Sequence, residues 1–451
     1  MIRKAVQVAG TKEQQAKSSG HRAIFILWLI ILHLCLAAGV LSYTLSVGHL
    51  PPLRNGRTFL LITDLSGAGP DVEISFYNEA GLNAATFHKL LPPRGKIKID
   101  VDKYLQTVGT VVLKSSKEEI AGEYWQVYEN RSMFMLPLQC PGEAGRYFVD
   151  RFRFPSCGSK LLVISDPNGS GPLVQMEFYD SAGELASIDR KLLRPHGVLV
   201  LEMDDYAPPD TSGKVSIRSF GGSIVLHYRQ LCRDKVILAA SARLPAKELI
   251  IDEFSTDSKI TGNLVITDAS AEGPVIELQF MNENGEVVAR QEKLLPRNGA
   301  LEIDPADYVD DIVDGIIKIS SEVEISVDYW EKNSQTILHT PAIGKLGSKL
   351  FISHFAPLDN TKYLLSLLNV GKESVDVEIQ FYGDDGKKLG SEEIALEPYK
   401  QIDKLVENYF VGARPGTIIV IGPNANLVVT ANIFDLKNTR HLGKAHAQVI
   451  E

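Results

Sequence analysis

One short pattern recurs four times along the chain at a nearly constant interval, and it limits the folds that the chain can adopt. It reads FYNEAG at residues 76–81, FYDSAG at 178–183, FMNENG at 280–285 and FYGDDG at 381–386, so the steps are 102, 102 and 101 residues. Solenoid repeats are only about 20–50 residues long. The interval therefore indicates a series of small domains, each able to bury a core of its own.

The repeated sequence extends well beyond this turn. A junction motif, YFVDRF at residues 147–152, recurs as LIIDEF at 249–254 and LFISHF at 350–355, and stepping back by 102 residues places the first junction at LSVGHL, from residue 45. The four copies are therefore predicted at residues 45–146, 147–248, 249–349 and 350–451. They account for the whole chain after residue 44.

Within each copy, apolar and polar residues alternate with the period of a β-strand. Val72, Ile74 and Phe76 share one face, and the same parity recurs in the other copies. A tight turn follows in each copy, with its glycine expected at positive φ. Seven or eight short strands per copy, separated by Gly, Pro, Asn and Asp, predict an all-β chain of four tandem antiparallel β-sandwich, Ig-like domains. A turn of helix is expected at residues 305–308, with an aspartate as its N-cap.

These turns, the LxP segment after them and the junctions that end in HF or EF carry a resemblance. Residues 45–451 resemble the loosely defined, largely uncharacterised tandem β-sandwich proteins with repeats of about 100 residues that bacteria export. The resemblance implies a non-catalytic extracytoplasmic protein, and it carries over no active-site residue.

The first 41 residues have a different character. Residues 1–22 contain five basic residues and one acid, and residues 23–41, AIFILWLIILHLCLAAGVL, carry no charge. Nineteen apolar residues are long enough to cross a bilayer as a helix. We therefore expect a transmembrane signal anchor at 23–41, a cytoplasmic segment at 1–22 and an exported remainder, in the periplasm or on the cell surface. A cleaved signal peptide is the alternative.

Composition and motifs narrow the classes of function. The net charge of −9, without a basic patch beyond the N-terminus, argues against nucleic acid as a partner. The chain contains no GxSxG elbow, HExxH helix motif, P-loop or dinucleotide fingerprint. We therefore expect no enzymatic activity, no catalytic residue and no cofactor, and a hydrolase is only a distant third hypothesis.

Three sets of residues are candidate sites. An acidic stretch offers carboxylates to a calcium ion at Asp304, Asp307, Asp310, Asp311 and Asp314, although its spacing is not that of an EF-hand, and a solvated loop is the alternative. Trp125 and Trp330 lie in strands where one of two neighbouring aromatics must face away from the core, so either can bind a glycan or a protein partner, or pack against a neighbouring domain. Cys140 and Cys157 can form a disulfide in an oxidising compartment, or remain isolated small side chains.

The sequence favours a membrane-anchored structural or interaction protein: a scaffold, a spacer or an adhesin-like stalk. Four copies held end to end predict a reach of about 150 Å from the membrane. The fourth copy, which lacks the Gly-Pro loop of the others, is expected to be a terminal cap whose outer face meets no other copy. Expected partners are envelope or surface proteins, or the chain itself. The alternative is a carbohydrate- or matrix-binding module that uses its aromatic residues.

Overall fold

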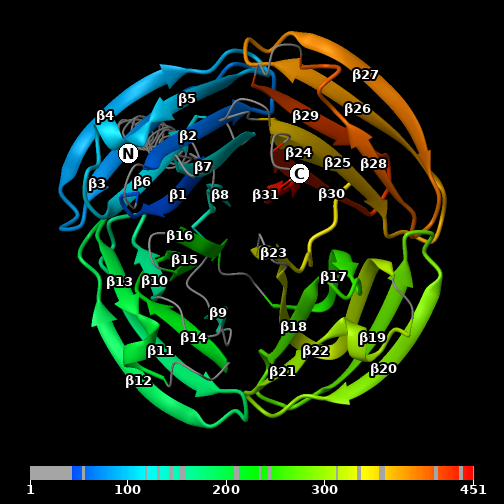
Figure 1. The fold of residues 1–451 in the computed structure, drawn as a ribbon. Coiled ribbons are helices and arrows are strands. Elements are labelled where there is room, and N and C mark those ends of the chain that lie inside the picture. Colours follow the sequence, from blue (N-terminus) through cyan, green and yellow to red (C-terminus); the bar gives the residue numbers. More distant parts are fainter. Residues whose placement is uncertain are drawn as a thin grey trace, which may run out of the picture. The chain divides into compact units, whose positions relative to one another are not determined.

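The computed structural model describes residues 43–52, 56–116, 119–128, 133–141, 146–151, 159–207, 213–232, 235–241, 245–310, 313–332, 337–354, 361–410, 415–435 and 440–449. In these residues the regular structure consists of β-strands and three short 3-10 turns, and the strands pair antiparallel (Figure 1). For these residues, the prediction of an all-β fold with antiparallel sheets is confirmed. The predicted segments 1–22 and 23–41 lie outside the described residues.

The strands follow the four sequence copies in order. The first copy contains β1 (Tyr43–His49), β2 (Gly56–Asp64), β3 (Asp71–Asn78), β4 (Asn83–Leu90), β5 (Lys96–Asp100), η1 (Val101–Lys103), β6 (Gly109–Ser115), β7 (Ile120–Tyr128) and β8 (Met133–Pro137). The second contains β9 (Arg146–Arg151), β10 (Lys160–Ser165), β11 (Leu173–Asp180), β12 (Leu185–Leu192), β13 (Val198–Glu202), η2 (Met203–Asp205), β14 (Gly213–Phe220), β15 (Val225–Cys232) and β16 (Lys235–Ser241).

The third contains β17 (Ala246–Ser255), β18 (Thr261–Asp268), β19 (Val275–Asn282), β20 (Val287–Leu294), β21 (Ala300–Ile303), η3 (Pro305–Asp307), β22 (Asp314–Lys332) and β23 (Ile337–Pro341). The fourth contains β24 (Lys349–His354), β25 (Thr361–Asn369), β26 (Val375–Gly383), β27 (Lys388–Leu396), β28 (Gln401–Leu405), β29 (Gly416–Ile421), β30 (Leu427–Asp435), β31 (Arg440–His446) and β32 (Gln448–Val449).

One strand order recurs along the chain. The first copy forms one sheet in the order β1-β6-β3-β4 and a second in the order β5-β2-β7-β8. The second and fourth copies repeat both orders, with β32 added at the edge of one sheet of the fourth. In the third copy the long strand β22 belongs to both halves and joins them into one seven-stranded sheet. Strands β4, β12, β20 and β27 each end a sheet and so present a free edge.

The apolar and polar positions that alternate in the sequence of β3 correspond to more and less buried side chains in the structure. Val72, Ile74 and Phe76 of β3 are completely buried, and they pack in one cluster with residues of both sheets of the first copy, such as Val111 of β6 and Ile62 of β2. The turn glycines of the four copies have φ between 79° and 87°, as expected. The helical turn at 305–307 is capped by Asp304, whose Oδ1 accepts the Ala306 N–H at 3.0 Å.

A second kind of strand is buried on both faces. In β2, Leu60 and Ile62 pack in the core of the first copy, whereas Phe59 and Leu61 pack in a cluster made mostly of residues of the fourth copy. The same holds between the second and third copies, because Val265 and Trp330 join the core of the second. Ile250 and Met281 of the third copy pack against Leu368 of the fourth. Sheets therefore pack face to face between copies as well as within them.

These contacts close on themselves within residues 43–451, which form one compact unit. Strand β8 contacts β16, β16 contacts β23, β23 contacts β31, and β31 contacts β8. The fourth copy therefore packs against the first. The expectation of an end-to-end row with a free terminal cap was wrong, because the outer face assigned to the cap is covered by the first copy. A closed cycle of sheets is also the arrangement by which β-propellers keep their exposed edges short.

Candidate functional site

The repeated turn that opened the sequence analysis is a docking element. We call residues 78–82, 180–184, 282–286 and 383–387 the docking turns, and residues 92–95, 194–197, 296–299 and 397–400 the receiving turns. Each docking turn lies against the receiving turn of the next copy. A Cβ placed on Gly81 would lie 1.9 Å from the Pro195 carbonyl oxygen, and one on Gly183 would lie 1.9 Å from that of Arg297. Only glycine allows this approach.

The fourth docking turn returns to the first copy in the same way. A Cβ on Gly386 would lie 1.8 Å from the Pro93 carbonyl oxygen, and the Lys96 N–H donates to the Asp384 carbonyl at 2.9 Å. The equivalent hydrogen bond joins Ala300 to Ser181 at 3.0 Å. One geometry thus serves a contact between neighbours in the sequence and a contact between the two ends of the array.

Side chains of the receiving turns add contacts specific to each interface. Arg94, His196, Asn298 and Tyr399 occupy the same left-handed position, with φ of 56–58°. Arg94 donates to the Tyr382 hydroxyl at 2.9 Å, and the His196 ring stacks on Tyr77 with centroids 4.1 Å apart. The backbone is shared by all four interfaces, but the side chains are not.

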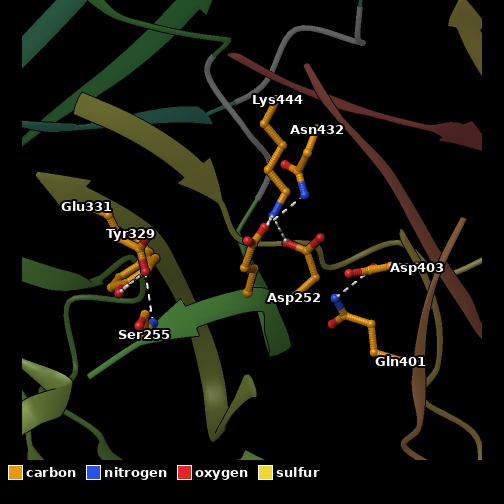
Figure 2. Close-up of polar contacts among 9 residues, drawn as sticks. Asp252, Ser255, Tyr329, Glu331, Gln401, Asp403, Asn432 and Lys444 are labelled. Atoms are coloured by element: carbon orange, nitrogen blue, oxygen red, sulfur yellow. Dashed lines mark hydrogen bonds and ion pairs between the residues drawn. The ribbon is translucent and has the colours of Figure 1, made fainter. Parts of the chain in front are cut away.

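A buried ionic cluster lies between the third and fourth copies (Figure 2). Lys444 of β31 donates to Asp252 at 3.1 Å and to Glu253 at 2.9 Å, both on β17, and Asn432 of β30 donates to Glu253 at 3.2 Å. Burial alone would lower the pKa of Lys444, but these two carboxylates outweigh it and hold that pKa above its ordinary value. The lysine therefore remains charged inside the interface.

Figure 2 also shows Glu331 of β22, a carboxylate whose pKa lies near neutral pH. Its Oε1 accepts the Tyr329 hydroxyl at 2.8 Å and the Ser255 N–H at 2.9 Å. Burial is the main cause that raises the pKa of Glu331 to about 7; the charge of Glu253 adds to the shift, and the Tyr329 hydroxyl and Lys444 oppose it. Burial also raises the pKa of Tyr329, so this phenol stays protonated.

The interface between the first and second copies contains buried histidines instead of carboxylates. His49 Nδ1 lies 2.8 Å from the Tyr124 hydroxyl, and Arg229 Nε donates to His227 Nε2 at 3.1 Å. Burial, followed by the charge of Arg229, lowers the pKa of His49 to about 3 and also lowers that of His227. Both rings are therefore neutral at physiological pH.

An open groove of about 630 Å³ lies on the surface between the first and second copies. Its lining combines part of a docking turn, including Glu79, with Leu192, Arg194 and Leu199 of the second copy. The volume falls within the range of small-ligand sites. The mixed lining contains no cluster of titratable groups that would suggest chemistry.

The structure places both candidate tryptophans in cores. Trp125 is 0% exposed, lies in the cluster shared with the fourth copy and donates from Nε1 to Glu123 at 2.9 Å. Trp330 is 6% exposed and lies in the core cluster of the second copy. A glycan platform needs an exposed ring. Burial against a neighbouring copy therefore favours the packing interpretation of both residues.

The acidic stretch is not gathered into a site where the structure describes it. Asp304 caps the 3-10 turn, and no group of three or more potential metal ligands occurs among the described residues. Asp307, Asp310 and Asp314 belong to the described chain, whereas Asp311 lies outside it. Cys140 is exposed, and Cys157 lies outside the described residues, so the disulfide stays a prediction.

The described residues contain no helix with the length and apolar character needed to span a membrane. The predicted anchor, 23–41, is outside that range.

Comparison with known proteins identifies no family. No family model matches the chain, and no curated protein matches it. Among solved structures, it is similar to a protein designated Thermotoga maritima 1070, with 17% identity over 24% of this chain and 97% of that one and a TM-score of 0.21. The partial N-terminal region of an Enterococcal surface protein shows 9% identity over 74% and 90% of the two chains, with a TM-score of 0.19.

An alpha-L-rhamnosidase of Streptomyces avermitilis shows 9% identity over 70% of this chain and 44% of that one, with a TM-score of 0.16. With TM-scores this low, neither a detailed fold nor a function can be inferred for this chain from these structures.

Proposed function

We propose that the chain is a non-catalytic, membrane-anchored extracytoplasmic interaction protein whose four β-sandwich domains, 45–146, 147–248, 249–349 and 350–451, form one closed scaffold. The observation that carries the proposal is the contact of the fourth copy with the first, through Gly386 against Pro93 and Arg94 with Tyr382. Copies joined end to end would hold bound partners far apart. Copies in a closed arrangement keep their binding surfaces at fixed positions relative to one another. The chain is therefore a platform, not a stalk.

The junction with the predicted anchor supports a platform held close to the bilayer. The apolar stretch ends at residue 41, and β1 begins at Tyr43, paired along its whole length with β6. In the sequence only Ser42 lies between the two, so the proposal includes no long tether. The basic residues of 1–22 keep the N-terminus cytoplasmic in this proposal and place the scaffold outside.

Partner proteins have a repeated feature to bind on the free edge strands. Leu90, Leu192 and Leu294 end β4, β12 and β20, and these side chains are 73%, 74% and 70% exposed. Large apolar side chains at the same exposed position in three copies favour protein contacts over a solvated rim. The fourth copy has Ala395 at this position.

In-cell cross-linking of the tagged full-length protein, followed by mass spectrometry, tests this function. We expect a defined set of envelope proteins linked to residues of the edge strands. The variant Leu90→Glu/Leu192→Glu/Leu294→Glu should lose these links, and the matched variant Glu73→Gln/Glu177→Gln/Glu277→Gln on the neighbouring strands should keep them. Recovery of the chain alone, or turnover of a substrate by the purified protein, would contradict the proposal.

A further inference from the structure

The four interfaces share one backbone geometry but differ in the polar residues that they bury. On one side of three of these interfaces lies the junction motif that begins a copy, with the pairs Gly48–His49, Asp252–Glu253 and Ser353–His354 at equivalent positions. On the other side lie residues of the following copy. Because the backbones are interchangeable, these side chains are what distinguishes one interface from another.

At the closing interface, Lys96 of the first copy finds its hydrogen-bond partners in the fourth. Its Nζ donates to Ser353 Oγ at 3.1 Å, to the His354 carbonyl at 2.8 Å and to the Gly416 carbonyl at 2.7 Å. The lysine side chain is 1% exposed, and the Asp384 carboxylate lies 3.7 Å away. The other copies have Val198, Ala300 and Gln401 at this position. A lysine therefore occurs at this position only in the first copy. It lies at the closing interface, whose two copies are not consecutive in the sequence.

Glu123 completes the closing set from β7. It is 3% exposed, and its Oε2 accepts the Trp125 Nε1–H at 2.9 Å. Burial raises the pKa of the Glu123 carboxyl, whereas the Trp125 hydrogen bond, the charge of Lys96 and Ser353 oppose the rise. A buried lysine and glutamate together suit the uncharged Ser353. They do not suit the pair Asp252–Glu253, because Glu123 would then be buried against two further carboxylates.

The interface between the third and fourth copies has the opposite requirement. Asp252 and Glu253 face Lys444, so this surface of the third copy needs a cation on the copy that docks there. A neutral partner surface would leave the buried Asp252 carboxylate, which is 4% exposed, without compensation, at a large cost.

The interface between the first and second copies discriminates by shape. A Cβ on Gly48 would lie 2.8 Å from Val163 Cγ1 and 3.1 Å from His227 Cε1. The equivalent residues in the third and fourth copies, Asp252 and Ser353, are larger. Neither of those copies can dock on the second copy without displacing these side chains.

We propose that these buried residues form a pairing code that determines which copy docks on which, with Lys96 and Glu123 selecting the fourth copy for closure. Wrong pairings, either within the chain or with a second copy of the chain, meet a buried like charge, an uncompensated charge or a steric clash. The code excludes the wrong copies as partners, both within a chain and between chains, and so reduces the number of ways in which this heterologous interface can extend into open polymers. The inference rests on the closed arrangement in the proposed function. It does not depend on the membrane anchor or on the partner proteins proposed there.

Refolding of the full-length protein in detergent, at a series of protein concentrations, tests the code. In Lys96→Met, the buried Glu123 loses the nearby positive charge of Lys96, and the thermal midpoint should fall. In Lys96→Met/Glu123→Leu, the apolar pair should restore part of the midpoint, because the His354 and Gly416 carbonyls still lack their donor. Oligomers should replace monomer as the concentration rises, as measured by light scattering, because copies with an uncharged junction pair can then dock on the first copy. The wild type should refold to monomer throughout. A double variant that remains as monomeric as the wild type would overturn the proposal.

Two further variants keep the test decisive. Lys96→Gln/Glu123→Thr introduces the residues that the fourth copy carries at these positions, Gln401 and Thr430, so it suits the fold, and it should also form oligomers. Lys214→Met removes a buried lysine that contacts Asn298 across the interface of the second and third copies, which the chain already joins. It should stay monomeric. Oligomers from Lys214→Met to the same extent would show a general loss of stability and refute the code.

Discussion

At the scale of single residues, the glycines of the docking turns carry the contacts between copies. Gly386 has φ of 79° and no room for a Cβ against Pro93, whereas Gly221 has φ of 85° and open space around it. Both positions impose the cost of a left-handed backbone on any other residue. Only Gly386 also imposes the cost of separating two copies.

The comparison of Gly386→Ala with Gly221→Ala therefore isolates the docking contact. Gly221→Ala should lower the free energy of unfolding by about 1 kcal/mol through backbone strain. Gly386→Ala should lower it by about 2–3 kcal/mol more, because the new methyl group forces the turns apart. Urea denaturation measures both. Equal losses in the two variants would show that the approach of the turns contributes nothing.

Glu331 gives the protein a predicted dependence of stability on pH. The pKa of this carboxyl is about 7 in the folded protein, against an ordinary value of 4.5. Between these values the folded state binds more protons than the unfolded state, so stability falls as pH rises from 4.5 to 7. The loss amounts to about 3 kcal/mol, and Glu331→Gln should remove it.

Denaturation at a series of pH values tests this prediction, with the exposed Glu302→Gln as the control. The control should keep the slope of the wild type. An unchanged slope in Glu331→Gln would show that Glu331 is ionised in the folded protein throughout this range.

At the scale of elements, a repeated aspartate organises the loop after the second strand of a copy. Asp64 accepts the N–H groups of Ser66 and Gly69 at 2.9 Å each, and that of Arg94 in the receiving turn at 3.0 Å. Asp166 and Asp268 make equivalent bonds. The aspartate therefore connects the Gly-Pro loop to the turn on which the neighbouring copy docks.

The fourth copy uses Asn369 in this place, with different hydrogen bonds. Its Nδ2 donates to the carbonyls of Glu373 and Leu396, and its Oδ1 accepts the Gly371 N–H. Asp64→Asn would place an amide N–H against backbone donors, and Asn369→Asp would place a carboxylate against carbonyls. Each exchange should cost about 2 kcal/mol of stability in urea denaturation. Tolerance of either would show that the loop, not the side chain, sets the turn.

The strand pattern could be predicted at this scale, because the alternation around Phe76 or Phe280 follows directly from burial on one face. The loop aspartates are visible in the sequence as the TD and SD before the Gly-Pro loops. Their role was missed because it depends on Arg94, thirty positions away, which only the fold brings near.

At the scale of the whole molecule, one sequence signal for closure was present but was not interpreted. The second strands read TFLLITD, KLLVISD, GNLVITD and LLSLLN; these are apolar stretches without strict alternation, interrupted only by Ser366 in the last. Such runs are typical of strands buried on both faces. Had they been interpreted so, they would have predicted that copies pack on one another, including the fourth on the first. The choice of Lys96 as a closing residue could not be predicted, because its partners Ser353 and Gly416 are more than 250 positions away.

Small-angle X-ray scattering of residues 43–451 tests the closed arrangement most directly. A compact unit of this length has a radius of gyration of about 22 Å. Four copies in an end-to-end row about 150 Å long would have one of about 40 Å. We predict the smaller value, unchanged with protein concentration. The larger value would contradict the contact of the fourth copy with the first, and with it the platform that we propose.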